Sequence, residues 1–142
     1  MKKVHRRGTE NAEKTMEMND LTRQIIGAAI KVHREMGPGL LESSYQICMR
    51  QELKLRGIAF EHEKDLPLFY KGVYLDCGYR LDLLVAGQVI VEIKSIKAFD
   101  AVHTAQMLTY LRLTGCKVGL LINFNVPVLI DGVKRVVNRF NE

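Results

Sequence analysis

Apolar residues recur along this chain with two different spacings, which divide it into predicted helices and strands. Three segments carry apolar residues at helical spacing, on one face of a 3.6-residue period. They comprise residues 19–36, 40–56 and 98–114. The remaining segments are short runs rich in branched and aromatic residues, which are typical of strands. They comprise residues 58–63, 66–70, 73–77, two runs within 79–95, 117–124 and 133–138.

Capping and helix-breaking residues support these boundaries. Asn19 or Asp20 can cap the first helix, and the Gly-Pro-Gly segment at residues 37–39 can end it. Gly57 and Gly115 follow the second and third helices. The resulting order is two helices, a meander of strands, a helix and two strands. This order predicts an α/β sandwich with a mixed sheet.

Residues 1–18 differ from the rest of the chain because they are polar, charged and without apolar periodicity. We expect them to form a disordered basic tail, and residues 19–142 to form a single domain. The chain has 142 residues and a formal net charge of +5, so its surface is mildly basic. Such a charge is compatible with a polyanionic partner without identifying one.

Targeting and cysteine patterns restrict the class of protein. No apolar stretch follows the basic N-terminus and no run is long enough to span a membrane, so we expect neither a signal peptide nor a membrane segment. The cysteines, Cys48, Cys77 and Cys116, are widely spaced, which disfavours zinc fingers and disulfide scaffolds. The expected setting is a reducing cytoplasm.

Three charged residues interrupt the two apolar runs within residues 79–95. Side chains alternate along a strand, so Glu92 and Lys94 point to the same face. Asp82 joins them only if it lies opposite Glu92, which requires a hairpin loop of odd length. Residues 86–88 provide such a loop, with Gly87 supplying the positive φ. In that register the three charged groups converge beside an apolar core.

Two carboxylates on neighbouring strands suit a divalent cation, most naturally Mg²⁺ or Mn²⁺. A lysine two residues after one of them can stabilise developing negative charge or hold a nucleophilic water. Asp82, Glu92 and Lys94 are therefore candidate catalytic residues. The alternative is an ion pair of Lys94 with Asp82 or Glu92 at the end of the sheet, without catalysis.

Several sequence words, read together, resemble a known family. Residues 39–45 (GLLESSY) match the signature that names the GxxExxY family, and residues 33–39, 119–124 and 133–138 are similar to its other words. The order of elements, with an aspartate on one hairpin arm and Glu-x-Lys on the other, resembles the PD-(D/E)xK nuclease superfamily. The resemblance extends from about residue 20 to residue 138.

This resemblance implies a restriction-endonuclease-like three-layer core, in which helices flank a mixed sheet. It identifies Asp82 and Glu92 as metal ligands and Lys94 as the catalytic lysine. Glu42 is similar to the acidic residue that many of these nucleases present to the same site, as a further ligand. A carboxylate at a helix start also has a second explanation, since it favours the positive end of the helix dipole. Tyr45 shares a helix face with Glu42 and is a candidate for substrate binding.

Gln106 and Tyr110 form a Q-x-x-x-Y spacing that is similar to the motif after the active site of RecB-like exonucleases. They lie on one helix face and could reach a phosphate or a metal-bound water; the alternative is a core-edge tyrosine beside a solvated glutamine. His33 and His103 are further candidates, as a ligand or proton shuttle, or as structural groups.

Two features depart from the family pattern. Leu81 rather than proline precedes the aspartate of the hairpin. The three scattered cysteines cannot build the four-cysteine iron–sulfur cluster of some RecB-like members.

The resulting hypothesis is a Mg²⁺- or Mn²⁺-dependent nuclease that hydrolyses phosphodiester bonds, with DNA as the first expected substrate and RNA as the second. Binding should be mainly to phosphates, and a homo-oligomer is compatible with the sequence. The alternatives are a non-catalytic nucleic-acid-binding or adaptor protein that retains the fold, and a structural module whose basic surface is incidental.

Overall fold

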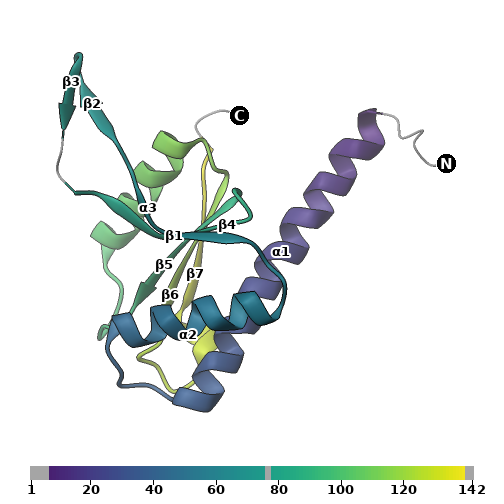
Figure 1. Cartoon of the computed structure of the whole chain (residues 1–142), viewed down its shortest axis with the longest axis vertical. Coiled ribbons are helices and arrows are strands. Elements are labelled where there is room, and N and C mark those ends of the chain that lie inside the picture. Colours follow the sequence, from purple (N-terminus) through teal and green to yellow (C-terminus); the bar gives the residue numbers. More distant parts are fainter. Residues whose placement is uncertain (1–6, 76–77, 140–142) are drawn as a thin grey trace.

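The computed structural model describes residues 7–75 and 78–139, with the side chains of residues 7–17 left undescribed. Its helices and strands follow one another as shown in Figure 1. In chain order they are α1 (Arg7–Met36), α2 (Glu42–Leu55), β1 (Phe60–Asp65), β2 (Leu68–Tyr70), β3 (Val73–Leu75), β4 (Arg80–Val85), β5 (Val89–Lys94), α3 (Ala101–Thr114), β6 (Val118–Asn123), the short 3-10 helix η1 (Leu129–Gly132) and β7 (Val133–Val137).

Five strands form one mixed sheet in the order β1-β4-β5-β6-β7, and β2 and β3 form a separate two-stranded ribbon. Neighbouring strands of the large sheet are antiparallel except β5 and β6, which are parallel. A parallel pair needs a long crossover connection, and α3 supplies it. Helices α1 and α2 pack on one face of the sheet and α3 packs on the other, which confirms the predicted α/β fold with a mixed sheet flanked by helices.

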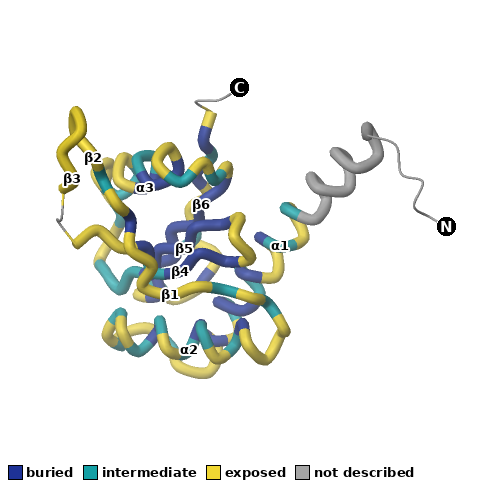
Figure 2. The backbone as a smooth tube through the Cα atoms, turned by 45° about the horizontal axis from the view of Figure 1, so that its top comes forward, coloured by how far each residue is buried: buried dark blue, intermediate teal, exposed yellow. Residues whose placement is uncertain are grey.

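Alternation along the strands divides the core into two parts. Leu83 and Val91 face α1 and α2, whereas Leu84 and Ile90 face α3. Strands β5 and β6 are almost fully buried, and Figure 2 shows them as the dark centre of the molecule. Burial of both faces explains why their sequences are continuous apolar runs rather than alternating ones.

Helix α3 approaches β6 closely because position 119 has no side chain. A Cβ atom at Gly119 would lie 2.4 Å from Sδ of Met107, a residue that is fully buried. The glycine in this apolar strand therefore marks a close approach of helix and sheet.

The β4–β5 hairpin has the odd-length loop that the sequence predicted. Leu83 pairs with Val91 and Val85 pairs with Val89, which leaves residues 86–88 as the loop. Gly87 has a φ of 66°, as expected, and Ala86 also adopts a positive φ of 52°, which the sequence did not indicate. In this register, Asp82 and Glu92, the charged residues just beyond the paired segment, are at opposite positions on the two strands.

The start of the first helix differs from the expectation. Helix α1 begins at Arg7 rather than at Asn19 or Asp20, so it includes residues 7–18 of the expected tail. Residues 9–18 contain no glycine or proline and are rich in Glu, Ala, Lys and Met, which favour helices without an apolar stripe. Met18 already packs against the core. Residues 1–6 of the expected tail lie outside the described residues.

Other boundaries shift by one to three residues, the largest shift being the start of α3 at Ala101 rather than at residue 98. The first strand is Phe60–Asp65 rather than 58–63, and the second begins at Leu68, after Pro67, which has no N–H to donate to a ladder. The expected end of the third strand, at residues 76–77, lies outside the described residues. Among the described residues, no helix combines the length and the apolar character needed to cross a lipid bilayer.

Candidate active site

Asp82 and Glu92 meet where the β4–β5 pairing ends. Continuing the register of Leu83 with Val91 by one position places Asp82 opposite Glu92. The backbone N–H of Asp82 donates to Oε2 of Glu92 at 3.0 Å, and the N–H of Ile93 donates to Oδ2 of Asp82 at 2.8 Å. Two carboxylates thus take the place of backbone acceptors between the strands, and the predicted convergence of these side chains is confirmed.

Both carboxylates sit in an environment that disfavours their charge. Glu92 is 5% exposed, and Asp82 is half-buried. Burial, followed by the neighbouring charge of Asp82, raises the pKa of Glu92 from 4.5 to about 8. Burial also raises the pKa of Asp82. A bound cation would relieve this electrostatic cost.

Lys94 lies near both carboxylates without bonding to either. Its positive charge lowers the pKa of Asp82 and of Glu92, in opposition to burial. Within the described part of the chain, Lys94 forms no ion pair within 4.0 Å. The alternative of a Lys94 ion pair with Asp82 or Glu92 is therefore not what the structure contains.

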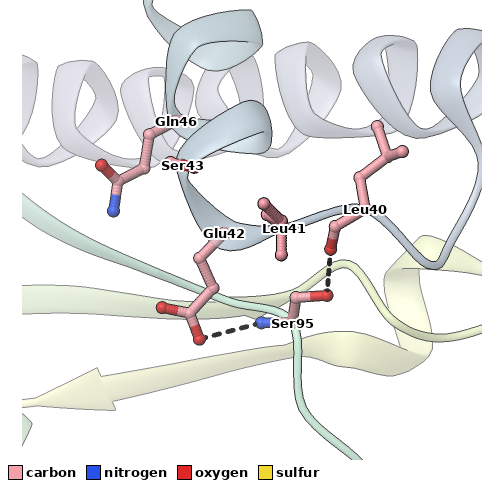
Figure 3. A pocket seen from close by; sticks show the side chains of 6 residues that line it. All are labelled: Leu40, Leu41, Glu42, Ser43, Gln46 and Ser95. Atoms are coloured by element: carbon pink, nitrogen blue, oxygen red, sulfur yellow. Dashed lines mark hydrogen bonds between the residues drawn. The ribbon is translucent and has the colours of Figure 1, made fainter.

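Glu42 reaches the same region from the first turn of α2. Its Oε2 accepts a hydrogen bond from the N–H of Ser95 at 3.2 Å, and the Ser95 hydroxyl donates to the carbonyl of Leu40 at 2.7 Å (Figure 3). The charge of Glu42 also raises the pKa values of Asp82 and Glu92. Glu42 thus joins the beginning of α2 to the end of β5. Its negative charge, in the first turn of α2, is also stabilised by the positive end of the helix dipole.

An open pocket of about 570 Å³ lies beside Glu42. Figure 3 shows the side chains that line it, from the start of α2, the preceding loop and the end of β5. They belong to Leu40, Leu41, Glu42, Ser43, Gln46 and Ser95.

Tyr45 occupies a different place from the one expected of a substrate-binding residue. It is fully buried, and its ring stacks on Phe124 with a centroid distance of 4.4 Å. Its hydroxyl donates to the carbonyl of Gly37 and accepts from the N–H of Leu40. Tyr45 therefore holds the loop that precedes α2, because a fully buried ring in this structure has no surface to offer a substrate.

Gln106 and Tyr110 lie on α3, on the opposite face of the sheet from Glu42. Gln106 is exposed and Tyr110 is buried. Burial, together with the negative charges of Glu92 and Asp82, raises the pKa of Tyr110 to about 12. The phenol therefore lies within electrostatic reach of the two carboxylates.

The two candidate histidines have structural partners. Nε2 of His33 lies 2.7 Å from the carbonyl oxygen of Val126, and the residue is buried. Nδ1 of His103 accepts a hydrogen bond from the N–H of Asp100 at 3.0 Å, and Asp100 in turn caps α3. These contacts account for both residues without a ligand or a proton shuttle.

Sequence reasoning missed Glu63, which comes from the neighbouring edge strand. His62 of β1 pairs with Leu83, so the next position places Glu63 opposite Asp82. Its charge raises the pKa of Asp82, and its φ of 50° is rare for a residue other than glycine. The available signal was the acidic alternation within residues 60–65, but pairing partners across a sheet are not encoded locally.

Asn123 was also missed, and it supports the segment that follows Lys94. The residue is 2% exposed at the end of β6. Its Oδ1 accepts from the N–H groups of Ile96 and Asn125, and its Nδ2 donates to the carbonyl of Ile96. An asparagine ending an apolar run was the signal that could have identified it.

The chemistry of the donors fits a hard cation, although the described residues contain no preformed group of three or more His, Cys, Asp or Glu side chains that could hold a metal. Carboxylate oxygens are the ligands that Mg²⁺ and Mn²⁺ prefer, and Mg²⁺ is commonly held by one or two carboxylates with water and phosphate completing the shell. Asp82 and Glu92 meet that minimum, and the cost of crowding their charges gives a reason for a cation there.

Comparison with known proteins identifies the family of this chain. The family model of the PD-(D/E)XK nuclease superfamily matches residues 19–136. No curated protein and no solved structure matches the chain. The matched segment contains all of α2 and α3 and the five-stranded sheet, except for the last residue of β7. It also contains Asp82, Glu92 and Lys94. Since the match covers most of its 142 residues, the chain belongs to the PD-(D/E)XK nuclease superfamily.

Proposed function

We propose that this protein is a Mg²⁺- or Mn²⁺-dependent nuclease whose active site is formed by Asp82, Glu92 and Lys94. The observation that carries the proposal is that the half-buried carboxylate of Asp82 on β4 lies opposite the buried carboxylate of Glu92 on β5. Lys94 lies nearby, and neither carboxylate forms an ion pair with it. Membership of the superfamily supports a nuclease-like function.

Asp82 and Glu92 would hold the metal ion, and Glu42 would contribute from α2. When bound, the ion would supply charge neutralisation and a more acidic water. The backbone hydrogen bonds to Asp82 and Glu92 keep one oxygen of each in place, so the carboxylates are oriented before a cation arrives. Glu42 is oriented in the same way by the N–H of Ser95.

Lys94 would orient the attacking water or stabilise the negative charge that develops on the phosphate. Its ammonium is available for either role because no carboxylate lies within 4.0 Å of it among the described residues. Lys94 is the last residue of β5, where it pairs with Asn123 of β6, and it is followed by Ser95, whose N–H donates to Glu42 of α2.

The substrate class is nucleic acid, with DNA as the first candidate. A formal net charge of +5 favours association with a polyanion, and the resulting phosphate contacts should weaken with salt.

The direct test is cleavage of end-labelled single-stranded and double-stranded DNA and RNA with Mg²⁺, with Mn²⁺ and with a chelator. We expect cleavage that requires the metal and that falls by about a hundredfold or more in Lys94→Ala. Lys117→Ala is the matched control, because Lys117 is exposed and precedes β6 at the opposite end of the strand from Lys94.

Two results would contradict the proposal. One is the absence of metal-dependent cleavage of any of these substrates by the wild-type protein. The other is cleavage that Lys94→Ala and Lys117→Ala reduce equally. Salt-dependent binding without cleavage would instead favour the non-catalytic nucleic-acid-binding alternative.

A further inference from the structure

A cavity of about 260 Å³ lies between α3, the first residue of β2 and Tyr79, which precedes β4. It is separate from the pocket beside Glu42, with which it shares no lining residue. Its lining consists of Leu68, Tyr79, Gln106, Thr109, Tyr110 and Leu113.

The lining combines flat aromatic surface with a few polar groups. Tyr79, which is 41% exposed, supplies the accessible ring and makes no aromatic ring contact within the described part of the chain, whereas Tyr110 borders the cavity with a ring that is only 5% exposed. Leu68 and Leu113 supply apolar surface, and the exposed amide of Gln106 can both donate and accept. A planar heteroaromatic ligand with a polar edge matches this lining, because it can stack on a ring while its edge bonds an amide.

The cavity adjoins the proposed active site through Tyr110. Side chains alternate along β5, so Glu92 lies on the same face of the sheet as Ile90, and Ile90 and Tyr110 belong to the same part of the core under α3. The charges of Glu92 and Asp82 accordingly raise the pKa of Tyr110. A ligand seated against Tyr79 and Tyr110 would therefore lie on the face of the sheet that carries Glu92.

We propose that this cavity receives an unpaired nucleobase adjacent to the phosphate that is cleaved, so that the enzyme acts on single-stranded or frayed nucleic acid. The inference rests on the proposed nuclease function and adds the strandedness of its substrate. A base inside a duplex is stacked and paired, and entering such a cavity requires it to leave the stack. An unpaired base enters without that cost.

The test measures binding separately from cleavage, using the full chain in chelator. Fluorescence anisotropy compares a labelled single-stranded oligonucleotide with a blunt duplex of the same sequence. We expect Tyr79→Ala to weaken single-strand binding by about tenfold while leaving duplex binding unchanged, and Tyr79→Phe to retain wild-type binding. Tyr79 is 41% exposed and pairs with Leu66 through its backbone carbonyl, so the substitution keeps that hydrogen bond.

Tyr74→Ala is the matched control, because Tyr74 is an exposed tyrosine on β3 that does not line the cavity. As a second readout, an iodouracil-substituted single strand should photocrosslink to Tyr79 or Tyr110. Crosslinks at these residues and a selective effect of Tyr79→Ala would support the proposal.

Equal losses in Tyr79→Ala and Tyr74→Ala, unchanged single-strand binding in Tyr79→Ala, or crosslinks only elsewhere would each overturn it. The failure of the nuclease function looks different. In that case the wild-type protein never cleaves, whether or not Tyr79 governs single-strand binding.

Discussion

Asp82 and Glu92 each cost the folded protein free energy in their charged forms. A carboxylate removed from water without a compensating charge is unfavourable by several kcal/mol, in order of magnitude. The two backbone hydrogen bonds that they accept offset part of this cost, since both lower the pKa values that burial raises. The remainder makes the stability of the metal-free protein sensitive to substitution, to pH and to divalent cations.

Replacing Asp82 by asparagine should separate a metal site from a structural ion pair. Asp82→Asn removes one of two crowded charges while keeping an oxygen that can accept from the N–H of Ile93. The metal-free variant should therefore melt at the same temperature as wild type or higher. It should lose most of the stabilisation by Mg²⁺ and all cleavage, while nucleic-acid binding largely survives. Thermal melting with and without Mg²⁺, together with a cleavage assay, measures all three.

Asp20→Asn is the control, because Asp20 forms an exposed ion pair with Arg23 on α1, outside the strands that carry the cluster. It should change neither the response to Mg²⁺ nor cleavage. The metal-site interpretation fails if Asp82→Asn unfolds more easily than wild type and the wild-type protein never cleaves.

The raised pKa of Glu92 predicts the sign of a pH effect on stability. The pKa of Glu92 is about 8 in the folded protein and 4.5 ordinarily. Between these two pH values, Glu92 keeps its proton in the folded protein but releases it in the unfolded chain. The contribution of protonated Glu92 to the stability of the fold is complete below pH 4.5 and is lost as the pH rises through about 8. The metal-free protein should therefore melt at lower temperature as the pH rises across this interval.

Glu92→Gln should flatten this dependence, because the amide does not titrate, and Mg²⁺ should restore stability to the wild type at the alkaline end. Melting curves over a pH series measure both effects. An unchanged slope in Glu92→Gln would show that other groups cause the pH dependence.

The loop before α2 and the end of β5 act as one structural element. Glu42 and Ser95 join them, and the Tyr45 hydroxyl closes the loop by bonding Gly37 and Leu40. The G-x-x-E-x-x-Y spacing thus has a physical basis here. Its glycine has a φ of +99°, its glutamate reaches the sheet, and its tyrosine anchors the loop in the core.

Tyr45→Phe tests this element, since it keeps the ring that stacks on Phe124 but removes the hydroxyl. The carbonyl of Gly37 and the N–H of Leu40 each lose a partner, so unfolding free energy should fall by about 1–3 kcal/mol. Cleavage should also decrease because Glu42 is held less firmly. Urea denaturation measures the first effect. Tyr74→Phe, on an exposed ring, should change little, and an equally small effect of Tyr45→Phe would show that the hydroxyl does not hold the loop.

In the whole molecule, one sheet lies between two helical layers. Truncation of the N-terminal part of α1 tests which residues of that helix the fold requires. Met18 is partly buried against the core and Ile25 is fully buried. We expect removal of residues 1–17 to leave the melting temperature nearly unchanged, because the sequence shows no apolar periodicity there.

Removal of residues 1–25 is the contrasting truncation and should destabilise the protein strongly, since it deletes Ile25 from the core. Thermal melting compares the two truncated chains with the full chain. A large loss of stability on removing residues 1–17 alone would mean that this segment packs on the fold.

Local patterns in the sequence were enough to predict most elements and the central hairpin. The period of the apolar residues distinguishes helix from strand, and the parity of a hairpin loop determines which residues face each other across it. For that reason the sequence could state the condition under which Asp82 lies opposite Glu92, a hairpin loop of odd length, and the loop at residues 86–88 meets it. The early start of α1 escaped this reasoning because helix propensity, rather than an apolar stripe, extends that helix.

Other properties required the packed structure, because they depend on residues far apart in the chain. The burial of Tyr45 against Phe124, the position of Glu63 opposite Asp82 and the contact of Glu42 with Ser95 all join separate elements. A local pattern gives a residue its face on a helix or strand, but the neighbour that covers that face comes from tertiary packing. Whether a tyrosine three residues after a glutamate reaches a substrate or fills the core is therefore decided only when α2 docks on the sheet.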